Sequence, residues 1–193
     1  MTKVFLIHRW GGNPKKDWYS WLKKELEKKN IEILIPSMPN PEEQKISQWV
    51  QYLEKNAGSP NEETFFIGHS VGCQTILRYL EKLPQKTKVG GVLFVAGWMN
   101  LTAETLEDKD SKRIAEPWIK TPIDWEKVKS HTKNFIAIFS DNDPYVPLSN
   151  SKIFKKKLGA KIIIEKKKGH FDEDTNVTQA PYIFDAIKKL IKT

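Results

Sequence analysis

The chain has 193 residues, a single cysteine and a formal net charge of +8. This length fits one domain, and one cysteine excludes a framework of internal disulfides. We therefore expect a single domain over residues 1–193 in the reducing environment of the cytoplasm.

The basic charge raises the question of a nucleic-acid partner, but the residue types disfavour one. Of the 32 basic residues 29 are lysines, and many stand among glutamates, as in residues 22–29. Nucleic-acid readers rely instead on arginine forks and aromatic platforms gathered in one patch. We expect a solvated basic surface and no nucleic acid, with Lys166, Lys167 and Lys168 attracting anionic substrates to a neighbouring cleft.

Six apolar runs with β-branched and aromatic residues predict strands, at 4–7, 31–35, 64–67, 89–95, 135–139 and 161–164. Segments of helical periodicity lie between and after them, at 15–29, 42–56, 73–82, 124–129, 149–158 and 178–191. Near-continuous apolar strands flanked by amphipathic helices are typical of a parallel sheet covered on both faces. The expected fold class is α/β, a three-layer α/β/α sandwich with a mainly parallel six-stranded sheet and right-handed crossovers.

The first predicted strand leads into His8-Arg9-Trp10-Gly11-Gly12. Its apolar run, residues 4–7, is far too short for a membrane span or for the apolar core of a signal peptide. We therefore expect no membrane partner.

The third strand is followed by Gly68-His69-Ser70-Val71-Gly72 and then by a helix that begins near Cys73. This is the pattern of a nucleophile elbow, a turn so sharp that the residues two before and two after the serine must be small. Ser70 is therefore the candidate nucleophile. Cys73 is expected to be a small buried residue of the following helix.

Residues 97–122 do not follow the alternation of strands and helices, and they include an acidic run at 104–110. We expect this segment to form at most a small cap or partial lid over the site. Trp98 directly follows a strand end, so we expect it to line a substrate pocket. Trp118 either lines the same pocket or packs the cap onto the sheet.

A serine hydroxyl needs a base to take its proton, and the base needs a carboxylate to orient it. Asp143 follows the fifth strand, in the string Asp143-Pro144-Tyr145-Val146-Pro147, with Asp141 as its competitor. His170 follows the sixth strand, after Gly169. Parallel sheets gather their functional groups at the carboxyl ends of the strands, so we expect these side chains to meet.

Together these motifs resemble the α/β-hydrolase superfamily, and within it the small, nearly lidless serine hydrolases of the retinoblastoma-binding-protein-9 type. The resemblance covers almost the whole chain, with the order Ser, Asp, His of that fold. It implies a triad of Ser70, Asp143 and His170 that hydrolyses an ester or amide of a small acyl substrate through an acyl-enzyme, without metal or organic cofactor. The family's Asp-x-x-Val-Pro turn favours Asp143, which leaves Asp141 as a turn residue.

The chain departs from the family pattern at Arg9, where a glycine usually follows the histidine. In this fold the oxyanion hole takes one amide from the residue after the nucleophile, here Val71, and one from the loop after the first strand. For the second donor we expect Trp10, with Arg9 and Gly11 as alternatives and the Arg9 side chain projecting outward. The Leu-x-Cys-x-Glu string that binds retinoblastoma-type pocket proteins is also absent, so we expect no such partner.

Three other histidines have expected structural roles. His8 should organise the oxyanion loop by hydrogen bonding, His69 should pack beneath the nucleophile, and His131 should lie on the surface. The string from His170 to Asp174 is not expected to bind a metal, because a tight site needs ligands from rigid elements.

Three functional hypotheses follow, ranked in this order. The first is a serine hydrolase of small acyl esters or amides. The second is an α/β-hydrolase-fold binding module with weak or no catalysis, suggested by Arg9, and the third is a nucleic-acid-binding protein. The sequence does not specify the acyl group, the leaving group or the oligomeric state, because these depend on pocket and surface shape.

Overall fold

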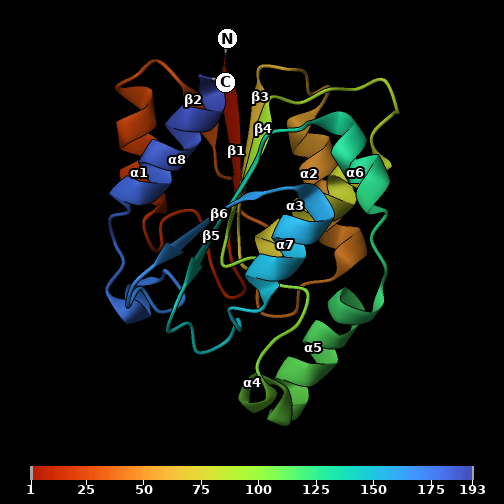
Figure 1. The fold of residues 1–193 in the computed structure, drawn as a ribbon, viewed down its shortest axis with the longest axis vertical. Coiled ribbons are helices and arrows are strands. Elements are labelled where there is room, and N and C mark those ends of the chain that lie inside the picture. The colour runs from red at the N-terminus through yellow and green to blue at the C-terminus, as the bar shows by residue number, and fades with distance from the viewer. Residues whose placement is uncertain (1, 193) are drawn as a thin grey trace.

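Six strands form one parallel sheet in the structure, a computed structural model that describes residues 2–192. They are β1 (Lys3–Ile7), β2 (Glu32–Leu34), β3 (Thr64–His69), β4 (Gly91–Val95), β5 (Phe135–Ser140) and β6 (Lys161–Glu165). Their order across the sheet is β2-β1-β3-β4-β5-β6, with every neighbouring pair parallel (Figure 1). The expected six-stranded parallel sheet is therefore confirmed.

Helices cover both faces of this sheet (Figure 1). On one face lie α1 (Tyr19–Glu27) and α8 (Pro181–Ile191), and on the other lie α2 (Ile46–Ala57), α3 (Val71–Lys82), α6 (Trp125–His131) and α7 (Asn150–Leu158). Phe66 packs into the core beneath α3, whereas its neighbour Ile67 packs into the core beneath α1 and α8. Successive strand residues face opposite layers, so both must be apolar. No helix within residues 2–192 has the length and apolar character needed to cross a bilayer.

All six expected helices begin at residues other than those predicted, and the backbone explains three of these differences. α1 begins at Tyr19, because Asp17 has a positive φ of 55° that a helix does not accommodate. α3 begins at Val71, because Ser70 itself makes the turn out of β3. α8 begins at Pro181, whose fixed φ suits the first helical position.

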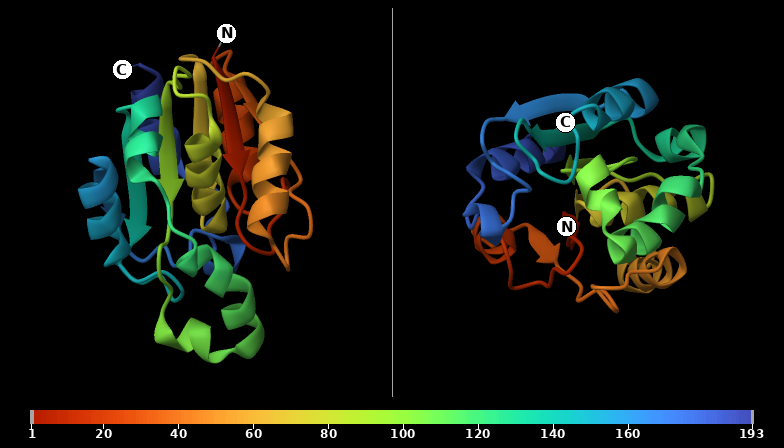
Figure 2. Two further views of the ribbon diagram at one scale, coloured as in Figure 1. Left: turned by 90° about the vertical axis from the view of Figure 1, so that its right-hand side faces the viewer. Right: turned by 90° about the horizontal axis from the view of Figure 1, so that it is seen from below.

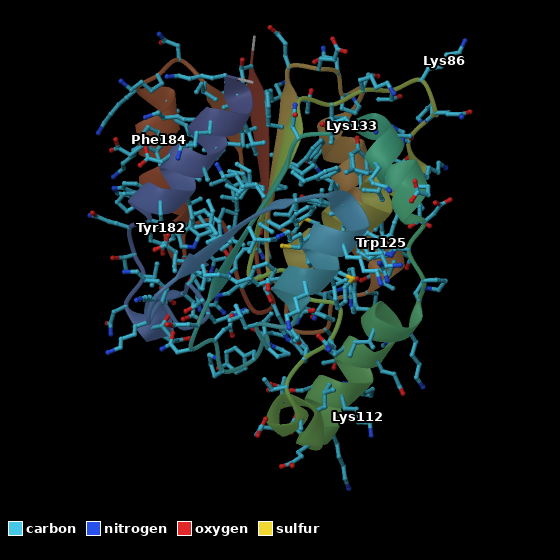
Figure 3. The ribbon with its side chains drawn as sticks, in the orientation of Figure 1. Lys86, Lys112, Trp125, Lys133, Tyr182 and Phe184 are labelled. Atoms are coloured by element: carbon cyan, nitrogen blue, oxygen red, sulfur yellow. The ribbon has the colours of Figure 1, made fainter. Side chains whose placement is uncertain are left out.

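Two helices that the sequence analysis did not predict, α4 (Ala103–Glu107) and α5 (Lys109–Lys120), extend beyond the carboxyl edge of the sheet (Figures 1 and 2). Figure 3 shows Lys112 of α5 near the end of this segment, away from the sheet. The side chains of Thr102 and Asp108 cap the two helices by accepting hydrogen bonds from the third amide beyond them. These caps were the available signal, while Pro117 inside α5 argued against a helix.

Buried polar side chains hold both ends of the α4–α5 segment. Asn150, the first residue of α7, accepts a hydrogen bond from the Met99 amide at 2.7 Å. Arg78 of α3 donates to the carbonyl oxygens of Trp118 and Thr121 at 2.9 and 2.7 Å. Those carbonyls lie at the carboxyl end of α5, where the last carbonyl oxygens of a helix have no N–H donor within the helix. The segment is thus fastened to the sheet-bearing body where it leaves and where it returns.

Cys73 is buried as expected, and its thiol donates to the Gly68 carbonyl oxygen at 3.1 Å. Burial raises the pKa of the Cys73 thiol above its ordinary value. His131 was expected on the surface, and this expectation is wrong. It is fully buried at the end of α6, because the segment that precedes β4 packs against it: its Nδ1 lies 2.8 Å from the Thr87 carbonyl oxygen, and its own carbonyl oxygen accepts from the Val89 amide.

Candidate active site

Ser70 occupies a strained turn between β3 and α3, with φ of 55° and ψ of −119°. A backbone conformation of this kind costs a non-glycine residue on the order of 1–3 kcal/mol and persists only where its surroundings enforce it. The two flanking glycines provide those surroundings. A Cβ atom at Gly72 would lie 2.2 Å from the Ile7 carbonyl oxygen, and one at Gly68 would lie 2.6 Å from the Cys73 nitrogen. The glycine spacing in the sequence therefore follows from backbone contact.

Trp98 lies directly against the Ser70 hydroxyl. Its indole Nε1–H donates to Ser70 Oγ at 3.3 Å, and its ring is 1% exposed. The Trp98 carbonyl accepts a hydrogen bond from the Gln74 side chain at 2.9 Å, which fixes the tryptophan relative to α3. The sequence analysis expected Trp98 in a pocket wall but did not foresee a polar contact with the serine.

Asp143 and His170 are joined by a hydrogen bond. His170 Nδ1 lies 2.8 Å from Asp143 Oδ2, and both side chains are nearly inaccessible to solvent. The other carboxylate oxygen, Oδ1, accepts from the amides of Tyr145 and Val146 at 2.9 and 3.0 Å. The carboxylate is thus held by backbone on one side and presents its second oxygen to the imidazole.

Asp141 has a different task. Its Oδ1 accepts from the Lys167 amide at 2.8 Å, and neighbouring Asn142 accepts from the Gly169 amide at 2.9 Å. Both bonds tie the loop after β5 to the loop that precedes His170. The geometry therefore favours Asp143 over Asp141 as the partner of the imidazole.

A cavity of about 190 Å³ contains both Ser70 and His170 in its wall. Three aromatic rings, of Trp10, Trp98 and Tyr145, line it as well. Tyr145 stands edge-on to the His170 ring with 5.2 Å between the ring centroids. The sequence analysis missed Tyr145, although its place just after Asp143 in a turn was a usable signal.

Trp118 does not line this cavity, so one of its two expected placements is wrong. Its ring is buried on the far side of α5, where its Nε1 donates to the Gln44 carbonyl oxygen at 3.3 Å. The ring also packs edge-on against Trp49 of α2, with 6.4 Å between the centroids. Trp118 therefore fixes the α4–α5 segment to the body.

Among the four backbone amides of residues 9–12, in the loop after β1, one has no protein acceptor in the described part of the chain. The amides of Arg9, Gly11 and Gly12 donate to the Tyr19 hydroxyl, the Pro41 carbonyl and the Arg9 carbonyl, at 3.2, 2.9 and 3.0 Å. The Trp10 amide has no such partner within residues 2–192. Of the three amides considered for this loop, only that of Trp10 is thus available to a bound group.

The Arg9 side chain does not project outward as expected. Its Nε and Nη2 bind the two carboxylate oxygens of Asp17 at 2.9 and 3.2 Å, and its Nη1 donates to the Trp10 carbonyl oxygen at 3.2 Å. Burial works against the Asp17 charge, but the hydrogen bond from Arg9 prevails and lowers the pKa of Asp17. A fully buried carboxylate needs such a partner, which explains why the guanidinium folds inward.

His8 binds backbone on both sides of its ring. Its Nε2 accepts from the Met38 amide at 3.1 Å, so in the neutral ring Nδ1 carries the proton and donates to the Arg9 carbonyl oxygen at 2.9 Å. Burial lowers the pKa of His8 and favours this neutral form. The ring therefore orients the loop that includes Trp10.

Asp172 and its neighbours have structural contacts. Asp172 Oδ1 accepts from the Thr175 amide at 3.0 Å and caps the short 3₁₀ turn Glu173–Thr175. Among residues 2–192, no group of three His, Cys, Asp or Glu side chains is arranged to hold a metal ion.

The fold and its elbow define an α/β-hydrolase. A sequence model of the serine hydrolase family matches residues 4–189, and the chain belongs to that family.

Two relatives and two solved structures illustrate the likeness. The chain is 31% identical over 188 residues to the Bacillus subtilis (strain 168) protein YdeN, described as a hydrolase, covering 97% of this chain and 95% of YdeN. It is 28% identical over 173 residues to the serine hydrolase RBBP9 of Rattus norvegicus, covering 88% and 87%. The crystal structure of the B. subtilis ydeN product aligns over 100% of both chains with a TM-score of 0.91 and 28% identity. Est1E of Butyrivibrio proteoclasticus shares the fold, at a TM-score of 0.72 and 12% identity over 100% of this chain and 90% of Est1E.

Proposed function

We propose that this hydrolase cleaves small carboxylic ester or amide bonds through an acyl-enzyme formed on Ser70. The observation that supports this most is the 2.8 Å hydrogen bond between Asp143 and His170, at a cavity that Ser70 also lines. The serine, the base and the orienting acid come from the ends of β3, β6 and β5. That constellation is what nucleophilic acyl transfer requires.

In the proposed acylation step, Ser70 Oγ forms a bond to the substrate carbonyl carbon while His170 Nε2 takes the hydroxyl proton. The carbonyl π electrons move to oxygen and give a tetrahedral oxyanion. The oxyanion collapses, the bond to the alcohol or amine breaks, and the departing group takes the proton from His170. Water then attacks the acyl-enzyme by the same sequence and releases the acid and free Ser70.

Asp143 acts in this proposal by holding the imidazole. Its bond to Nδ1–H keeps Nε2 free to accept the serine proton and stabilises the imidazolium that forms. The amides of Tyr145 and Val146 hold the carboxylate in turn. The acid is therefore placed before substrate binds.

The amides of Val71 and Trp10 are the proposed oxyanion donors. Val71 begins α3, where backbone N–H groups have no helical acceptor and the helix dipole favours negative charge. Trp10 contributes the one amide among residues 9–12 that has no protein acceptor in the described chain. One such donor is worth about 3 kcal/mol of transition-state stabilisation.

The cavity limits the proposed substrate. Its volume of about 190 Å³ lies below the roughly 300–1,000 Å³ of typical ligand pockets. The aromatic rings in its wall suit an apolar or flat group, while Arg9, Asp172 and Asp174 also line the cavity. We therefore propose small acyl substrates, with no cofactor in the reaction and with the enzyme acting in the cytoplasm.

The second candidate is a binding module with little catalysis. It is favoured by Arg9, which lines the cavity and stands where the family has glycine. The pairing of Arg9 with Asp17 weakens this alternative, because the guanidinium is already engaged.

A fluorophosphonate probe distinguishes the two functions. The wild-type protein should be labelled on the peptide that contains Ser70, and Ser70→Ala should stay unlabelled while losing hydrolysis of p-nitrophenyl esters by at least about a thousandfold. An unlabelled wild-type protein would support the binding module. Esters of increasing acyl length, run beside aminoacyl amides, would then define the substrate.

A further inference from the structure

Three consecutive residues before and at the start of α1 contact the loop that contains His170. Asp17 Oδ1 accepts from the Glu173 amide at 3.0 Å, and the Trp18 indole donates to the Phe171 carbonyl oxygen at 2.9 Å. Tyr19 reaches the same loop through His69. All three side chains are buried.

The connection through Tyr19 and His69 is a continuous chain of hydrogen bonds. The Arg9 amide lies 3.2 Å from the Tyr19 hydroxyl, which lies 2.7 Å from His69 Nδ1. His69 Nε2 lies 2.8 Å from the carbonyl oxygen of His170. Tyr19 and His69 are both inaccessible to solvent.

The donor of each hydrogen bond in this series can be assigned from the chemistry of the groups. A carbonyl only accepts, so His69 Nε2 carries the proton and Nδ1 of the neutral ring accepts from Tyr19. The Tyr19 oxygen is then free to accept from the Arg9 amide. Burial and the neighbouring His170 charge lower the pKa of His69 to about 3, so the neutral ring persists at ordinary pH.

Both ends of this series of hydrogen bonds are backbone groups, and each belongs to a loop that contains a proposed catalytic group. Arg9 directly precedes Trp10, the proposed oxyanion donor, and the other end is the backbone of His170 itself. The loop after β6 includes four residues with positive φ angles, and two of them, Gly169 at 51° and Phe171 at 58°, flank His170. Such a loop keeps its shape only when it is held from outside.

We propose that Tyr19 and His69 are positioning residues that set the placement of the Trp10 loop relative to the His170 loop. This inference rests on the proposed serine hydrolase function. A displacement of about 1 Å between reacting groups can cost about a hundredfold in rate. Loss of these hydrogen bonds should therefore lower kcat more than it changes KM, because Trp98, Leu101 and Thr105 line the cavity from segments that the hydrogen bonds do not touch.

Tyr19→Phe removes the shared hydroxyl and keeps the ring. Trp18→Phe is its matched control, because it removes a buried hydrogen bond to the same loop, keeps an aromatic ring against His69, and leaves the hydrogen bonds among Arg9, Tyr19 and His69 in place. We expect Tyr19→Phe to lower kcat for a p-nitrophenyl ester at least tenfold with KM within twofold. Trp18→Phe should lower kcat less than threefold, although urea unfolding should show both variants destabilised.

A boronic acid that forms a tetrahedral adduct with Ser70 supplies a second readout. The affinity of the boronic acid for Tyr19→Phe should fall in parallel with kcat, because the adduct needs both loops in place. Its affinity for Trp18→Phe should stay within threefold of the wild-type value. Equal kcat losses in the two variants, or wild-type kcat in Tyr19→Phe, would overturn the positioning role.

Two substitutions of His69 test the same series of hydrogen bonds independently. His69→Gln retains a donor and an acceptor, and we expect it to keep at least fivefold more kcat than His69→Leu. Equal activity in these two variants would argue against the role. Ser70→Ala separates the hypotheses: if it keeps the wild-type rate, the hydrolase mechanism fails and the positioning role fails with it.

Discussion

The two sides of the cavity are held in different ways. On one side, the loops after β1 and β6 are joined by buried bonds through Asp17, Trp18 and the Tyr19–His69 chain. On the other, the α4–α5 segment has buried polar anchors at its two ends, and between them it has exposed pairs such as Arg113 with Glu43. Thr105 and Ser111 of that segment also line the cavity.

This difference separates the requirements of chemistry from those of substrate choice. The groups proposed to react need fixed distances, which buried and fully paired hydrogen bonds provide. A wall that only contacts the substrate tolerates change, and a segment anchored at its ends can vary in between. We therefore expect substitutions that weaken the contacts between the loops after β1 and β6 to lower kcat. Substitutions that weaken the anchors of the α4–α5 segment should alter KM.

The largest expected effect is that of Asp143→Asn. The amide would hold the imidazole in the wrong tautomer, so kcat should fall by about 10³–10⁴-fold. Asp141→Asn is the matched control and should change kcat less than about tenfold, because Asp141 binds only the Lys167 amide. Steady-state kinetics of both folded variants tests this assignment. A larger loss of kcat in Asp141→Asn than in Asp143→Asn would assign the role of orienting acid to Asp141.

His69, on the side of the cavity that buried hydrogen bonds hold, should also make the stability of the protein depend on pH. Burial first, and then the charge of His170, lower the pKa of His69 from 6.5 to about 3. Below pH 6.5 the unfolded chain therefore binds a proton at this histidine that the folded chain does not. The free energy of unfolding should therefore decrease as the pH is lowered from about 6.5 to about 3. His69 should contribute up to about 1.4 kcal/mol of this decrease per pH unit.

Urea unfolding at pH 7, 5 and 4 measures this dependence. His69→Gln has no titrating ring, so its free energy of unfolding should decline less steeply over the same range. Parallel pH profiles for the wild type and the variant would show that His69 is not the group responsible.

A smaller effect is expected at the anchor of the α4–α5 segment. Asn150→Leu fills the same space but leaves the Met99 amide, the Asn100 carbonyl and the Pro147 carbonyl without their side-chain partner. Its free energy of unfolding should fall by about 2–3 kcal/mol. We expect KM to rise severalfold with kcat within about threefold, and a selective loss of kcat would contradict the division between the two sides.

The smallest effect is expected for Arg113→Ala. Its ion pairs with Glu43 and Asp110 are solvent-exposed, and such pairs contribute little to stability. The unfolding midpoint and kcat should match the wild type within error. A clear loss of stability would mean that the middle of the segment is held more firmly than its contacts indicate.

The sequence by itself determined the sheet, the elbow and the chain order of Ser70, Asp143 and His170. These follow from local rules, because periodicity predicts strands and helices, and the glycine spacing reflects the close approach of β1 and α3 around Ser70. Position after a strand end was enough to choose Ser70 and His170 and to narrow the acid to Asp141 or Asp143, and the family's Asp-x-x-Val-Pro turn then favoured Asp143.

Only the tertiary structure decided which partners the remaining polar residues have. Arg9 folds onto Asp17, Trp118 joins Gln44, and His131 is buried, each against its expected placement or beyond it. Trp18 and Phe171 are 153 residues apart, and His69 and His170 are 101 apart. Such contacts depend on how elements pack in three dimensions, and no local pattern of residues encodes them.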